Sequence, residues 1–167
     1  MILKFFNKNF YISFSIVALI YFLDRLSKIY VIQLDKNNFG SDIFNSSYLN
    51  IVLIWNKGIA FGLFSFNETH LYNILSLIIS IIVIIVIIMS LRTQGFKRYS
   101  LLMVVGGALG NLHDRIFFNA VPDFIDFHIG EFHWFIFNVA DMFISLGVIF
   151  MILYELIDNN KNNDQKI

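Results

Sequence analysis

The sequence contains no cysteine, a single proline and few charged residues. The lack of cysteine excludes disulfide scaffolds, thiolate-bound zinc, iron–sulfur clusters and cysteine nucleophiles. Charged residues make up 14% of the chain, whereas they make up about 25% of a typical soluble domain. Lysine plus arginine and aspartate plus glutamate both number 12, so no excess of one sign indicates a nucleic-acid partner.

Apolar residues are abundant instead: 57% of the 167 residues are hydrophobic, and 20 phenylalanines are among them. A water-soluble fold of this size cannot bury that much apolar surface. A hydrophobic run of about 20 residues is long enough to cross a membrane. The sequence therefore predicts one all-α membrane domain over residues 1–167, with four transmembrane helices at 10–32, 71–91, 99–118 and 136–157.

The lysines and arginines outside these four segments predict the orientation of the chain. Most fall at its two ends and between the second and third segments, whereas only Lys36 and Lys57 fall on the opposite side. Because such residues prefer cytoplasmic loops, we expect both termini in the cytoplasm and residues 33–70 outside. Within that outer segment, residues 48–55 are rich in β-branched and aromatic side chains, which favours a strand in a small extracytoplasmic sheet.

Polar side chains within the apolar segments fall at one level of the predicted membrane. A charged group inside a bilayer costs roughly several kcal/mol unless it is paired, so each is a candidate for function. In the predicted orientation these groups lie near the outer face, and the inner halves of the segments hold almost none. They are Asp24, Lys28, Asn111, Asp114, Arg115, Asn138 and Asp141, with Asp123 and Asp126 in the outer loop before the fourth segment.

Helical spacing predicts which of these side chains meet. Asp24 and Lys28 are four residues apart, the spacing of an ion pair on one helix face. Arg115 directly follows Asp114, and we expect the two to pair. The GxxxG sequence at 106–110 is typical of close packing between helices.

Other chemistries have little support in the residues. The spacing of His113, His128 and His133 matches no familiar set of metal ligands, and no serine lies in a glycine-flanked elbow. We therefore expect neither a metal nor a serine nucleophile. A small ion- or proton-coupled transporter is the alternative function, because intramembrane charges also mark transport paths, but such a protein would need polar residues through the whole membrane depth.

Five motifs occur in order along the chain: DRLSK at 24–28, NKGIAFG at 56–62, GGALGNLHDR at 106–115, VPDFIDF at 121–127 and FNVADMFISLG at 137–147. Together they resemble the lipoprotein signal peptidase (signal peptidase II) family of bacterial membrane aspartic peptidases. The resemblance covers nearly the whole chain. It also departs from the family's usual form at Pro122 and at His113, neither of which replaces a motif residue.

The resemblance implies that Asp123 and Asp141 are the catalytic pair. On the residues alone, Asp126 and Asp114 are comparable candidates, and the choice of Asp123 rests mainly on the resemblance. The pocket supports that it implies are Asp24, Lys28, Asn56, Gly58, Asn111, Asp114, Arg115 and Asn138.

The resemblance also implies the substrate and the location. The expected substrate is a prolipoprotein whose cysteine carries a diacylglyceryl group, and the enzyme cuts before that cysteine. No metal or cofactor and no nucleic acid is expected. Membrane lipids are expected partners of a monomeric, multi-pass enzyme in the bacterial inner (cytoplasmic) membrane, with its active site at the extracytoplasmic face.

Overall fold

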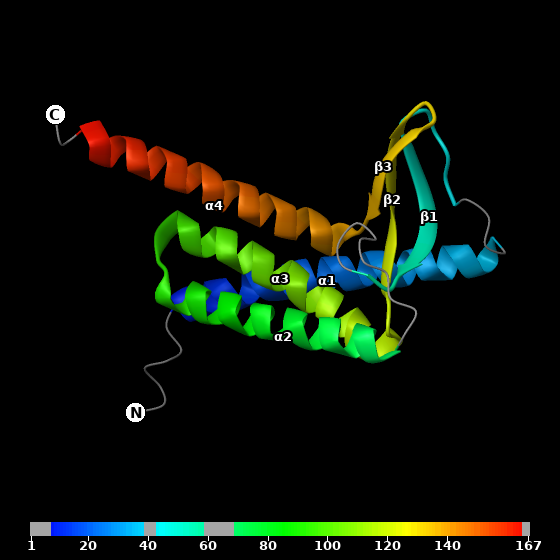
Figure 1. The fold of residues 1–167 in the computed structure, drawn as a ribbon, viewed down its shortest axis with the longest axis horizontal. Coiled ribbons are helices and arrows are strands. Elements are labelled where there is room, and N and C mark those ends of the chain that lie inside the picture. The colour runs from blue at the N-terminus through cyan, green and yellow to red at the C-terminus, as the bar shows by residue number, and fades with distance from the viewer. Residues whose placement is uncertain (1–7, 39–42, 59–68, 165–167) are drawn as a thin grey trace.

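The computed structural model describes residues 8–38, 43–58 and 69–164. Within these described residues, four helices and three strands follow one another (Figure 1). The helices are α1 (Lys8–Asn37), α2 (Thr69–Arg92), α3 (Gly95–Phe118) and α4 (Val139–Asp164), and the strands are β1 (Leu49–Asn56), β2 (Val121–Ile129) and β3 (Phe132–Phe137). The expectation of a mostly helical chain with a small sheet is confirmed.

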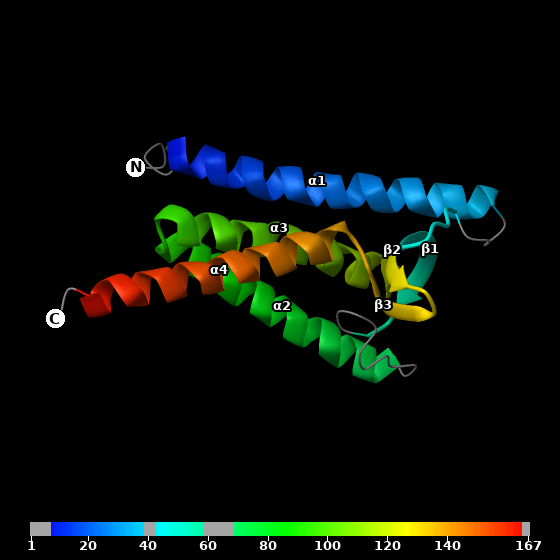
Figure 2. The ribbon, with the colours of Figure 1, turned by 90° about the horizontal axis from the view of Figure 1, so that it is seen from above.

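The helices lie alongside one another, and the sheet stands at one end of them (Figures 1 and 2). Helix α3 is central, because it packs against α1, α2 and α4. The start of α1, the connection between α2 and α3 and the end of α4 all lie at the end opposite the sheet. Residues from distant parts of the sequence are therefore brought together where the helices meet the strands.

Glycines on α3 allow this close packing. A Cβ atom on Gly106 would lie 2.8 Å from Ile20 of α1, and one on Gly110 would lie 2.4 Å from a carboxylate oxygen of Asp24. A Cβ on Gly107 would lie 2.4 Å from the carbonyl oxygen of Ala140 on α4. The prediction of close helix contact at 106–110 is therefore confirmed.

The sheet is antiparallel, with strand order β1-β2-β3. The strand predicted over 48–55 is confirmed as β1. We expected a loop around Asp123 and Asp126, but both residues lie in β2, the central strand. The pattern was hard to read from the sequence because β2 is buried on both faces at its start, so polar and apolar residues do not alternate there.

Hydropathy predicted the apolar part of each helix better than its ends. Helix α1 continues to Asn37, five residues beyond the predicted segment, because polar residues such as Asp35 and Lys36 end the apolar run without ending the helix. Conversely, residues 136 and 137 belong to β3, and α4 begins only at Val139.

Two of the described helices are long and apolar enough to cross a membrane by length and composition, at Tyr72–Arg92 and Val139–Asp158. Both leave large apolar side chains exposed; examples are Leu77 on α2 and Ile152 on α4, which are 61% and 52% exposed. Such surfaces are suited to contact with lipid rather than water.

Candidate active site

Asp141 lies in the first turn of α4, where it takes part in a reciprocal cap. The side-chain oxygen of Asn138 accepts a hydrogen bond from the backbone N–H of Asp141 (3.1 Å), and the Asp141 carboxylate accepts one from the backbone N–H of Asn138 (3.3 Å). This arrangement is a capping box, which satisfies backbone donors that the start of a helix leaves free. The two hydrogen bonds that cap the start of α4 therefore also hold the carboxylate of Asp141 in position.

Two asparagine side chains hold Asp123. The amide of Asn138 donates to one carboxylate oxygen at 2.6 Å, and the amide of Asn56, at the end of β1, donates to the other at 2.9 Å. Burial, followed by the negative charge of Asp141, raises the pKa of Asp123 to about 6, although both amide hydrogen bonds lower it. Asn138 therefore connects the two candidate catalytic carboxylates, and Asp123 keeps a proton more readily than an ordinary aspartic acid.

A third asparagine, Asn111, connects Asp141 to the ion pairs between α1 and α3. The side-chain amide of Asn111 donates to Asp141 at 2.8 Å, and its oxygen accepts a hydrogen bond from the Lys28 ammonium at 2.8 Å. An amide has both a donor and an acceptor, so Asn111 can bridge a carboxylate and a cation.

Four charged side chains form a buried network between α1 and α3. The Lys28 ammonium lies 2.9 Å from the Asp24 carboxylate and 2.7 Å from that of Asp114. Arg25 donates a hydrogen bond to one carboxylate oxygen of Asp114 at 2.7 Å and lies 2.6 Å from the other; a hydrogen bond between two charged groups is stronger than one between neutral groups. Two acids and two bases thus balance. Asp24 also accepts a hydrogen bond from the backbone N–H of Ala140 (3.0 Å), which links the network to the start of α4.

The Asp24–Lys28 pair is confirmed, but the prediction that Arg115 pairs with Asp114 is wrong. The guanidinium of Arg115 is buried and donates to the carbonyl oxygen of Gly58 at 2.8 Å. Consecutive helical residues do not face each other, so the two side chains point in different directions. Arg25 was not identified from the sequence as a partner of Asp114. It could have been, because Asp114 is a second acid in an apolar segment and needs a cation to balance its charge.

A hydrogen bond between Asn56 and Gly58 shapes the turn at the end of β1. The side-chain oxygen of Asn56 accepts a hydrogen bond from the backbone N–H of Gly58 at 2.7 Å, so the residue that contacts Asp123 also shapes the turn that receives Arg115. The rest of the predicted motif, residues 59–62, lies outside the described residues.

Asp126 does not share this site. Side chains alternate along a strand, and Asp126 is three residues from Asp123, so the two carboxylates face opposite sides of β2. Asp126 is buried and accepts hydrogen bonds from His133 (2.8 Å) and Asn50 (3.4 Å).

Pro122 and His113 do not interrupt the candidate site: Pro122 is paired with Trp55 in the sheet, and His113 bonds the hydroxyl of Tyr21 at 2.9 Å.

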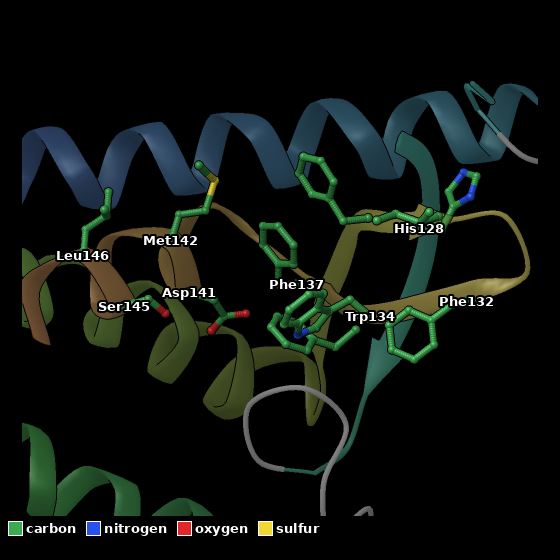
Figure 3. Close-up of a pocket in the computed structure, with 11 residues that line it drawn as sticks. His128, Phe132, Trp134, Phe137, Asp141, Met142, Ser145 and Leu146 are labelled. Carbon is green, nitrogen blue, oxygen red and sulfur yellow. The ribbon is translucent and has the colours of Figure 1, made fainter. Parts of the chain in front are cut away.

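Two cavities meet at Asp141. A cavity of about 270 Å³ is lined by both candidate catalytic residues, by Asn56, Asn111 and Arg115, and by Ile79, Ala108, Val121, Ile144 and Ser145. A larger, strongly apolar cavity of about 550 Å³ lies beside it under β2 and β3 (Figure 3). Its lining combines Asp141, Met142, Ser145 and Leu146 of α4 with Phe127, His128, Ile129, Phe132, Trp134, Phe135 and Phe137.

This arrangement can perform acid–base chemistry beside an apolar chain. Both carboxylates accept hydrogen bonds from asparagine amides and line the same cavity, and Asp123 retains a proton more readily than usual. Two adjacent carboxylates that share one proton can provide a general acid and a general base.

Comparison with known proteins identifies the family. Residues 16–157 match the family model described as signal peptidase (SPase) II. The lipoprotein signal peptidase of Pelagibacter ubique is 46% identical over 159 residues, covering 95% of this chain and 96% of the relative. The lipoprotein signal peptidase of Anaplasma phagocytophilum is 41% identical over 148 residues, covering 87% of this chain and 92% of the relative.

The fold comparison agrees with these relatives. A solved structure described as a bacterial membrane enzyme, determined by the in meso method at 2.3 Å resolution, superposes with a TM-score of 0.70 and 28% identity. The match covers 89% of this chain and 90% of the other. These findings do not support the alternative of a transporter. The chain belongs to the signal peptidase II family.

Proposed function

We propose that this protein is a membrane aspartic endopeptidase that removes the signal peptide from diacylglyceryl-modified prolipoproteins, cutting before the lipidated cysteine. The observation that carries the proposal is the pair Asp123 and Asp141, which line one cavity and are bridged by Asn138. Membership of the signal peptidase II family gives the substrate class.

The two carboxylates divide the chemistry between them. Burial and the neighbouring carboxylate raise the pKa of Asp123 to about 6, so the pair can share one proton. The protonated carboxyl donates this proton to the oxygen of the scissile carbonyl, and the ionised carboxylate accepts a proton from water as the water oxygen attacks the carbonyl carbon. The tetrahedral intermediate then collapses: the carbon–nitrogen bond breaks, the proton taken from water passes to the leaving amine, and a hydroxyl of the intermediate returns its proton to the first carboxylate. Donor and acceptor are both carboxylates, so the reaction needs neither metal nor cofactor.

The remaining polar residues hold these groups in place. Asn56 and Asn138 orient Asp123, and Asn111 orients Asp141. The network of Asp24, Arg25, Lys28 and Asp114 fixes α1 against α3 and the start of α4. Arg115 fixes the turn at Gly58.

The larger cavity suits the lipid part of the substrate. Its lining is almost entirely apolar, and it shares Asp141 and Ser145 with the cavity of the carboxylates. An acyl chain in the larger cavity would therefore place the adjoining peptide beside the catalytic pair. Burial of apolar surface contributes about 25 cal/mol per Å², so this cavity can supply much of the binding energy.

The protein lies in the bacterial inner membrane as a monomer, with all four helices spanning the bilayer and both termini in the cytoplasm. This topology is supported by the lysine and arginine distribution. It is also supported by the position of the sheet, which lies at the end opposite the start of α1 and the end of α4. The active site then faces the extracytoplasmic side, where it can admit a lipidated peptide from the bilayer.

Incubation of the purified protein with a diacylglyceryl-modified prolipoprotein tests the function directly. We expect a shift on a gel to the size of the mature lipoprotein, with no shift for the unlipidated precursor or for Asp141→Asn protein. A preparation that is folded but leaves the lipidated precursor intact would rule the proposal out.

A further inference from the structure

A second polar cluster lies on the face of the sheet opposite Asp123. Asp126 of β2 accepts the Nδ1–H of His133 on β3 at 2.8 Å and the amide of Asn50 on β1 at 3.4 Å. The ring of His128 stacks on that of His133, with centroids 5.0 Å apart, and its Nε2 lies 3.2 Å from the Asn50 oxygen. One side-chain network therefore joins all three strands, and neither catalytic carboxylate belongs to it.

The bond between Asp126 and His133 crosses an irregularity in the sheet. Asp126 pairs with Ile136 and His128 pairs with His133, so one residue of β2, Phe127, faces two residues of β3. The two are Trp134 and Phe135. This is a β-bulge, a feature that redirects side chains next to functional sites. The shift brings His133 one position closer to Asp126 than a regular register would.

The residues at the bulge form one wall of the larger apolar cavity. Phe127, Trp134 and Phe135 all line it, and Asp141 lies on its other side (Figure 3). The bulge thus sets which two adjacent side chains of β3 enter the cavity. Because adjacent strand residues normally face opposite sides, a regular β3 would direct only one of Trp134 and Phe135 into it.

We propose that Asp126 and His133 are positioning residues that hold the bulge of β3 and thereby set the acyl-chain selectivity of the enzyme. The inference rests on the proposed function, since it assigns the larger cavity to the substrate's acyl chains. The Asp126 side chain is only 5% exposed, and a buried carboxylate is stable only with its hydrogen-bond donors in place. Loss of His133 therefore forces β3 to rearrange or admits water at the bulge.

Tryptophan fluorescence tests the positioning without any substrate. The chain contains two tryptophans, so in a Trp55→Phe background the emission reports Trp134 alone. Asp126→Ala and His133→Ala should shift that emission, whereas Glu131→Ala, which removes an exposed acid at the turn of the same hairpin, should not. Asp126→Asn keeps an acceptor oxygen and His133→Asn keeps a donor nitrogen near the Nδ1 position, so both should restore the wild-type emission.

Kinetics with precursors carrying two hexadecanoyl or two octanoyl chains test the selectivity. Each CH₂ group that leaves water is worth roughly a fourfold change in affinity, so the wild-type KM should be many-fold lower for the longer chains. Asp126→Ala and His133→Ala should reduce this ratio several-fold while kcat stays within a factor of about two of the wild-type value, which a general loss of folded protein would not do.

Each failure has a separate meaning. Unchanged Trp134 emission in the alanine variants would overturn the positioning role, and an unchanged KM ratio would overturn the selectivity. If the wild-type protein cleaves neither precursor, the proposed function is wrong, and the emission measurement still decides whether Asp126 and His133 hold the bulge.

Discussion

The ammonium of Lys28 lies 2.7 Å from the carboxylate of Asp114, and both side chains are essentially without solvent exposure. The two residues belong to different helices and are 86 positions apart in the sequence. Together with the pair of Arg25 and Asp114, this salt bridge joins α1 to α3 at the level of the proposed catalytic pair. Through Asn111, the same ammonium is two hydrogen bonds from Asp141.

Removing Lys28 should destabilise the protein strongly. Lys28→Met leaves the two buried carboxylates, Asp24 and Asp114, with one cation instead of two. Loss of one partner of a buried ion pair typically lowers the free energy of unfolding by about 3–5 kcal/mol. Thermal unfolding in detergent measures the effect. Lys97→Met is the matched control, because Lys97 pairs with Glu155 at an exposed position where ion pairs contribute little. Equal melting temperatures for the two variants would contradict the prediction.

Arg115→Ala should act differently from what its position beside Asp114 suggests. Asp114 keeps Arg25 and Lys28, so no carboxylate becomes unpaired. The variant should lose the contact with Gly58 and, with it, the position of Asn56. We expect a larger loss of activity than of melting temperature, and a smaller loss of stability than Lys28→Met shows in the same assay.

Substitution of either proposed catalytic carboxylate should abolish measurable cleavage. Asp→Asn keeps the shape but removes the ability to exchange a proton, and general acid–base catalysis alone contributes roughly 10²–10⁴-fold. Asp123→Asn and Asp141→Asn proteins should still fold and bind the lipidated precursor. Asp126→Asn should keep a substantial part of the activity, because it preserves an acceptor for His133. Normal cleavage by Asp123→Asn protein with an inactive Asp126→Asn would reverse the assignment.

The rate should depend on pH through the proton that Asp123 and Asp141 share. Since the pKa of Asp123 is raised to about 6, kcat/KM should fall as the pH rises through that value and the acid is lost; the apparent pKa belongs to the pair. The Asn56 hydrogen bond lowers this pKa, so Asn56→Leu should move the fall to higher pH. Asn50→Leu, at the asparagine that faces Asp126, should leave the profile in place. If kcat/KM falls at the same pH in both variants, ionisation of Asp123 does not control the pH dependence.

Single cysteines test the topology cleanly, because the natural chain has none. In intact cells, a membrane-impermeant maleimide should label Glu131→Cys protein at the turn between β2 and β3. Gln94→Cys protein, labelled at the exposed connection before α3, should react only after the membrane is opened. Labelling at position 94 from outside would overturn the orientation.

Much of the site could be predicted from sequence because the free-energy cost of burying an unpaired polar group restricts where such residues lie in an apolar chain. The Asp24–Lys28 pair and the close packing at 106–110 follow from helical spacing, and both are present. Contacts between helices do not follow from spacing on one helix. Arg25 and Lys28 meet Asp114 because α1 packs against α3, whereas Arg115, its neighbour in sequence, points to Gly58.

The strands were harder to predict than the helices. β1 has a composition typical of a strand, but β2 carries two aspartates and a proline within nine residues, and such residues are depleted in strands. They lie there because Asp123 and Asp126 find amide and imidazole partners on neighbouring strands and at the start of α4. Tertiary hydrogen bonds decide this segment rather than local preference.

The order in which the chain is made gives the buried charges a further consequence. Lys28 is synthesised 86 residues before Asp114, whereas Asp24 lies four residues before it on the same helix. The Asp24–Lys28 pair can therefore form within α1 before α3 has been made, and Asp114 becomes available only afterwards. Asn138, Ala140 and Asp141 come later still, and they supply the cap of α4 and one of the two carboxylates. If Asp123 and Asp141 are the catalytic pair, as proposed, a nascent chain has no proteolytic activity until its last helix has begun.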